Sequence, residues 1–185
     1  MSYRNGTYVA FDGQGTTNPT LSDLRYYQLL RQWNSSSTID FSFSDSHSKT
    51  YQVRDTSSKA TLEQRLLERM RNSKNMLLIL SEDTSCNQGM LPFEIEKAVD
   101  FYDLPIIIAY PGYTRIGPPK DLSERWPDAL AKRMYAGSAK CIHVPFKKEP
   151  ILAAIKQFSV HNSKDDALDS PYQYYVSSAY DDWGL

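Results

Sequence analysis

Apolar residues form two kinds of pattern along the chain. Residues 76–80 and 106–109 are apolar throughout, as is typical of parallel strands covered on both faces. Residues 39–43 instead alternate strictly between apolar and polar positions, which indicates a half-buried strand. With residues 7–11 and 139–144, these segments make five predicted strands.

Segments with helical spacing of apolar residues lie between the predicted strands. Thr20 and Ser22 are candidate N-caps of the first helix, and Thr61 with Gln64 forms a capping box for the second. Further helices are predicted at residues 91–102 and 128–134, and one that begins with Pro150. Alternating strands and helices with right-handed crossovers predict an α/β fold, a flavodoxin-like doubly wound and mainly parallel five-stranded sheet with helices on both faces.

We expect residues 1–160 to form this domain and residues 161–185 to form a distinct C-terminal tail. The tail is acidic, rich in tyrosine and poor in aliphatic residues. Two structures are compatible with this composition: a flexible arm, or a segment whose aromatic side chains dock on the domain. A role in assembly as a homo-oligomer is a further hypothesis for the tail.

Composition narrows the classes of partner. The formal net charge is -1, which gives no electrostatic basis for binding nucleic acid or an anionic membrane. No apolar run approaches the roughly 20 residues that span a bilayer, and no signal peptide is visible at the start. The two cysteines, Cys86 and Cys141, show no metal-ligand spacing. We therefore expect a cytoplasmic protein with free thiols.

The predicted fold places a binding site beyond the carboxyl ends of the strands. The helix at residues 91–102 begins at the same edge of the sheet and opens with the sequence PFEIE. On a helical wheel Glu94 flanks the apolar stripe and can lean into a crevice, whereas Glu96 points to solvent. The alternative is that both carboxylates only stabilise the positive N-terminus of the helix.

Several segments together resemble a known family. TYVAFDGQG followed by DLRYYQLLRQW, then RMRNSKNMLLILSEDTS, and then MLPFEIEKAVDFYDLPIIIAY are similar in order and spacing to TIR domains. The resemblance is to the bacterial TIR-like kind found in Thoeris anti-phage systems, and it extends over roughly residues 7–158. Phe93 departs from the family pattern, because an aromatic ring stands where a Trp is customary.

The resemblance implies an enzyme that cleaves NAD at the nicotinamide–ribose bond, with Glu94 as the catalytic residue. NAD is then a substrate, and neither a cofactor nor a metal is needed. Phe11, Asp12 and Gly13 would line the nucleotide pocket, and Asp45 after the second predicted strand is a further candidate. The implied product is a signalling derivative of ADP-ribose, cyclic or hydrolysed, that activates a partner effector protein in antiviral defence.

Two alternatives come from other functional classes. One is a non-catalytic TIR module that acts as a scaffold by self-association. The other is a phospho-receiver-like site of Asp12, Glu82, Asp83 and Lys147 with one Mg²⁺, although Lys147 lies beyond the expected strand end. Cys86 has no neighbouring base in the sequence that would make it a nucleophile.

Overall fold

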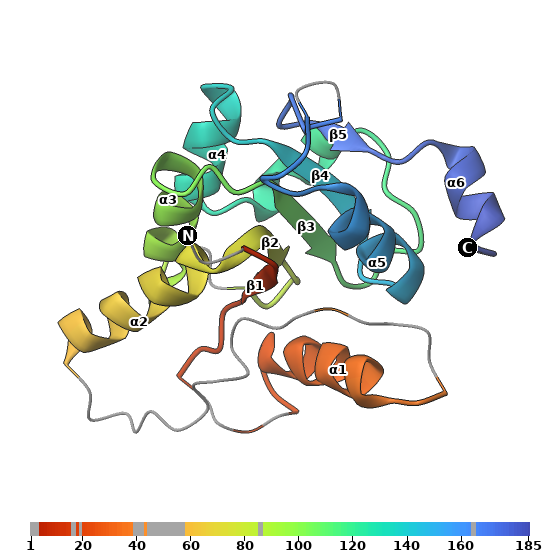
Figure 1. The fold of residues 1–185 in the computed structure, drawn as a ribbon. Helices are drawn as coiled ribbons and strands as arrows, with labels where there is room; N and C mark the ends of the chain where they lie inside the picture. The colour runs from red at the N-terminus through yellow and green to blue at the C-terminus, as the bar shows by residue number, and fades with distance from the viewer. Residues whose placement is uncertain are drawn as a thin grey trace.

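The computed structural model describes residues 4–15, 18, 20–38, 43, 58–84, 87–163 and 166–185. These residues contain one sheet in the order β1-β2-β3-β4-β5, in which every pair of neighbours is parallel (Figure 1). The strands are β1 (Gly6–Ala10), β2 (Ser73–Ile79), β3 (Ile106–Tyr110), β4 (Cys141–Pro145) and β5 (Gln173–Tyr174).

Helices cover both faces of the sheet (Figure 1). One face packs against α2 (Lys59–Arg71), α3 (Leu91–Asp100) and α4 (Asp128–Tyr135), and the other packs against α1 (Leu24–Ser35) and α5 (Lys148–Gln157). A 3-10 helix, η1 (Pro119–Arg125), precedes α4, and α6 (Ser177–Asp182) ends the chain. The predicted doubly wound α/β fold is therefore confirmed. Among the described residues no helix has the length and apolar character needed to cross a membrane.

Strand β2 shows why the sheet requires cover on both faces. Met76 and Leu78 pack with α2, α3 and α4, whereas Leu77 and Ile79 pack with α1 and α5. All four side chains are fully buried. Because successive side chains of a strand point to opposite faces, an uninterrupted apolar run can only be buried between two layers of helices.

The fifth strand differs from the predicted one. Residues 39–43 lie outside the described part of the chain except for Phe43, which is buried against the α1 and α5 face. The fifth described strand is β5, in the segment interpreted as a tail, and it pairs in parallel with β4. Tyr172 and Tyr175 pack against opposite faces of the core, and Tyr180 of α6 is 1% exposed. The tail is therefore docked, and it covers the backbone edge of β4.

Apart from α1, whose N-cap position is held by Asp23 and not by Thr20 or Ser22, two predicted helix starts were wrong by a few residues. Helix α2 begins at Lys59, and its N-cap is Ser58, whose side chain accepts a hydrogen bond from the backbone of Thr61. Thr61 is thus inside the helix that it was predicted to cap. Helix α5 begins at Lys148, so Pro150 lies within the first turn and not at its first position. In both cases a residue in the extended conformation precedes the helix and sets its start.

Candidate active site

Two loops meet at a pocket beyond the carboxyl end of β1. Asp12, Gln14 and Gly15 from the loop after β1 line it together with Gln88 and Gly89, which precede α3. The pocket has a volume of about 450 Å³. Asp12 accepts a hydrogen bond from the backbone of Gln14 at 2.9 Å, which stabilises the turn. The structure thus places a pocket at the sheet edge where the fold predicts a ligand.

Phe11 and Gly13 lie beside this pocket but do not line it. The ring of Phe11 stacks on Tyr27 of α1, with 4.9 Å between the ring centroids. The carbonyl of Gly13 accepts a hydrogen bond from the Ser22 hydroxyl at 3.2 Å. Of the three residues predicted after β1, Asp12 is the one that lines the described pocket. Asp45 lies outside the described residues.

Glu94 is buried in the first turns of α3, with 7% of its surface exposed. The hydroxyl of Tyr8, in the middle of β1, donates a hydrogen bond to its carboxylate. Burial raises the pKa of Glu94 from 4.5 to about 7, and the Tyr8 hydrogen bond and the positive charge of Arg69 on α2 partly oppose the rise. A buried carboxylate without partners would take up a proton and become neutral. Tyr8 and Arg69 therefore favour the charged form of Glu94.

The helical wheel correctly distinguishes the two glutamates of α3. Glu96 has 49% of its side chain exposed and pairs with Lys97 at 3.1 Å, as expected of a solvated residue. Glu94 lies inward, but its carboxylate is beside Tyr8 and is not among the described walls of the Asp12 pocket. The pocket at the strand ends therefore adjoins the start of α3, but the carboxylate of Glu94 does not line it in this structure.

Asp23 holds the loops of this edge together, which the sequence analysis missed. Its side chain is fully buried and accepts hydrogen bonds from the hydroxyls of Ser81 and Thr84, in the loop after β2. Its backbone N–H donates to the carbonyl of Asp12 at 3.3 Å. Burial raises the pKa of Asp23, and both hydroxyls oppose the rise. In the sequence, the signal for this contact was the hydroxyl residues Ser81 and Thr84, which follow the buried strand β2.

The acids of the receiver-like alternative do not gather around one point. Asp83 pairs with Arg25 of α1 at 2.8 Å, and Glu82 pairs with Arg125 of η1 at 2.8 Å. These partners lie on different elements, so each carboxylate is engaged in its own ion pair. Within the described ranges, no three His, Cys, Asp or Glu side chains form a group that could hold a metal ion. Cys86 lies outside those ranges.

His143 is a fully buried core residue whose two ring nitrogens are both hydrogen-bonded. Its Nδ1 accepts from the hydroxyl of Tyr110 at 2.8 Å, and its Nε2 donates to the carbonyl of Pro171 at 2.9 Å. The indole of Trp126 completes the chain by donating to the Tyr110 oxygen at 3.0 Å. Burial lowers the pKa of His143 to about 4, so the ring is neutral near pH 7. These bonds attach the tail to the sheet.

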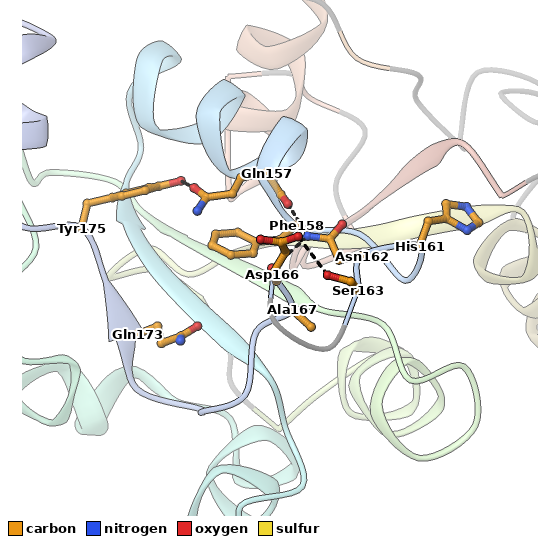
Figure 2. A pocket seen from close by; sticks show the side chains of 9 residues that line it. All are labelled: Gln157, Phe158, His161, Asn162, Ser163, Asp166, Ala167, Gln173 and Tyr175. Atoms are coloured by element: carbon orange, nitrogen blue, oxygen red, sulfur yellow. Dashed lines mark hydrogen bonds between the residues drawn. The ribbon is translucent and has the colours of Figure 1, made fainter.

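Figure 2 shows the walls of a second pocket, which has a volume of about 690 Å³. Gln157 and Phe158 at the end of α5 and Tyr175 after β5 are among its walls. The adjoining segment contacts the start of β2, because the N–H of Val160 donates to the carbonyl of Lys74 at 2.9 Å. This pocket is therefore at the amino ends of the strands, away from Asp12 and Glu94.

Comparison with known proteins identifies the family. Residues 8–116 match the family described as Thoeris protein ThsB, TIR-like domain. That match contains β1 from Tyr8 onward, the Asp12 loop, Asp23 and Glu94. Among solved structures, a conserved protein from Enterococcus faecalis V583 is similar with a TM-score of 0.49 and 15% identity, over 83% of this chain and 98% of that one. The family match covers more than half of the chain, and the protein belongs to the TIR-like domain family of the Thoeris protein ThsB.

Proposed function

We propose that this protein is an enzyme that cleaves NAD at the nicotinamide–ribose bond, with Glu94 as its catalytic carboxylate. The observation that supports the proposal is a buried carboxyl group whose pKa of about 7 lets it change charge near neutral pH. Such perturbed groups are concentrated at functional sites. In this proposal the product is an ADP-ribose derivative that activates an effector protein in antiviral defence.

The chemistry requires a negative charge near the ribose. The bond between C1 of the ribose and the pyridinium nitrogen breaks, and its electron pair leaves with nicotinamide, which becomes neutral. The ribose is left with oxocarbenium character, which the Glu94 carboxylate stabilises as it develops. The oxygen of water, or a hydroxyl of the same ADP-ribose, then bonds to C1 and releases a proton. No step needs a metal or a redox cofactor.

Substrate access requires a change around Glu94. In this structure Glu94 is 7% exposed, and its carboxylate accepts a hydrogen bond from Tyr8. NAD can contact it only when the side chain turns toward the Asp12 pocket or the covering residues move. We therefore expect turnover to depend on a trigger that opens the site, such as a factor present in phage-infected cells.

The same enclosure favours one other function, a non-catalytic module that acts by self-association. A carboxyl group that is fully covered and bonded to a core tyrosine can serve packing alone. The two functions differ in what Glu94 does. In the module Glu94→Gln changes only stability, whereas in the enzyme it abolishes turnover with the fold and the oligomeric state unchanged.

The test measures nicotinamide release from NAD by wild type, Glu94→Gln and Glu96→Gln, each in the presence of lysate from phage-infected cells. Glu96→Gln is the matched control, because it removes the same charge two residues away on the exposed face of α3. The proposal predicts release by wild type and by Glu96→Gln, and none by Glu94→Gln. Equal release by all three would show that the assignment of Glu94 is wrong.

A further inference from the structure

We propose that Tyr8 is a positioning residue for the reaction: its hydroxyl holds the Glu94 carboxylate in a fixed orientation and in its charged form. This inference rests on the proposed function. It assigns a role to a residue in the middle of β1, a place in the sheet that lies before the strand end where ligands are expected.

The geometry brings the hydroxyl of Tyr8 within hydrogen-bond reach of Glu94 on α3. Its side chain is fully buried on the face covered by α2, α3 and α4, and it donates to Oε1 of Glu94. The two residues are 86 positions apart in the chain. Parallel pairing with β2, in which Tyr8 lies opposite Met76, fixes the backbone of β1. The donor therefore sits on the rigid part of the fold, and the flexible glutamate side chain is held against it.

A neutral hydroxyl and a positive charge act on this carboxylate from two elements. Tyr8 faces it from β1, and the positive charge of Arg69 acts on it from α2. Of the other charged residues of α3, Glu96 and Lys97 pair with each other, and Asp100 pairs with Arg133 of α4. The neighbours Met76 and Leu78 of β2 are apolar. Burial raises the pKa of Glu94, and the Tyr8 hydroxyl and Arg69 are the two groups that lower it.

The Tyr8 hydroxyl remains a donor throughout the useful pH range. Burial, followed by the negative charge of Glu94, raises its pKa well above the ordinary value. A phenylalanine would fill the same apolar space, so packing alone does not require the oxygen. A buried hydroxyl is unfavourable unless it is bonded. The bond to Glu94 is therefore a contribution that phenylalanine could not make at this position.

The test compares Tyr8→Phe with wild type in two measurements. The first is a carbon-13 NMR titration of the Glu94 carboxyl, whose signal is identified by its absence in Glu94→Gln. The second is the pH dependence of nicotinamide release. Tyr102→Phe is the matched control, because Tyr102 packs at the border of the same cluster and no bond from its hydroxyl to Glu94 is present.

Loss of the hydrogen bond should raise the pKa of Glu94 by about one pH unit in Tyr8→Phe. The acidic limb of the activity profile should move by the same amount. Turnover at pH 7 should fall about fivefold, because a smaller fraction of the carboxyl is ionised, and it should recover toward the wild-type value at pH 9. A purely structural defect would lower turnover equally at every pH.

Three results would overturn the inference, and they identify which part fails. An unchanged titration and activity profile in Tyr8→Phe, with Glu94→Gln inactive, would remove the role of Tyr8 and leave the proposed function intact. A loss that is the same at every pH would also reduce Tyr8 to a packing residue. Full turnover in Glu94→Gln, or no release by wild type in any condition, would contradict the proposed function, and this inference would fall with it.

Discussion

Replacing Glu94 with glutamine should make the folded protein more stable above pH 7 than the wild type. In the folded state burial raises the pKa of Glu94 to about 7, whereas the ordinary value is 4.5. The folded protein therefore binds this proton more tightly than the unfolded chain does. Its contribution to stability falls as the pH rises from 4.5 to 7, and the loss is complete above that range.

The size of the effect follows from the two pKa values. Each unit of difference corresponds to 1.36 kcal/mol, so ionising Glu94 in the folded protein costs about 3 kcal/mol. That is a large part of the 5 to 15 kcal/mol by which domains are typically stable. Glutamine keeps an oxygen that accepts from Tyr8 and never ionises. Its amide group needs a new partner, which should offset about 1 to 2 kcal/mol of the gain at every pH.

Because of His143, the pH dependence of stability in wild type alone does not reveal the contribution of Glu94. The difference in stability between Glu94→Gln and wild type does reveal it. Its pKa is lowered to about 4 by burial, from an ordinary 6.5. Its contribution to stability is therefore present above pH 6.5 and is lost as the pH falls toward 4. This trend opposes that of Glu94 over nearly the same range. The two should almost cancel in wild type, and only the comparison with Glu94→Gln separates them.

The assay is urea unfolding at pH 5, 6, 7 and 8, followed by the fluorescence of the three tryptophans. The stability of Glu94→Gln minus that of wild type should rise by about 2 kcal/mol or more between pH 5 and pH 8. Glu96→Gln should show no such rise, because Glu96 is exposed. A constant difference for Glu94→Gln across this range would refute the raised pKa of Glu94.

Three other substitutions test the fold around the site. Leu78→Ala, in the fully buried centre of β2, should lower the free energy of unfolding by about 2 to 5 kcal/mol in urea, and a smaller loss would contradict the two-sided core. Asp23→Ala leaves the buried hydroxyl of Ser81 without its acceptor and should cost about 1 to 3 kcal/mol, measured in the same way; an unchanged midpoint would mean that the loops do not depend on it. Arg115→Ala breaks an exposed ion pair with Asp181 of α6 and should change stability by less than about 1 kcal/mol, so a larger fall in the thermal midpoint would assign the tail a stronger anchor there.

The parts of the fold that could be predicted are those with a strong local pattern. The uninterrupted apolar runs predicted β2 and β3, because only two layers of helices can bury both faces of such a strand. Strand β5 has two residues, Gln173 and Tyr174, and lies at the edge of the sheet. It pairs with the edge of β4 and is held by the neighbouring tyrosines. These contacts join distant segments, so no local sequence pattern predicts them.

The candidate site divides in the same way. The helical wheel separated buried Glu94 from exposed Glu96, because that distinction depends on spacing within one helix. The bond between Tyr8 and Glu94 depends on how α3 lies over β1, and the bonds of Asp23 depend on where two loops meet. Contacts between segments so far apart in the chain require the tertiary structure. The catalytic role of Glu94 stays a prediction.

The most direct test of the account is the product formed from NAD. Wild type and Glu94→Gln would be incubated with NAD, with and without lysate from phage-infected cells, and the nucleotides separated and weighed by mass spectrometry. The account predicts equal amounts of nicotinamide and an ADP-ribose derivative from wild type, and neither product from Glu94→Gln. Intact NAD in every condition would contradict the enzyme and favour the self-associating module.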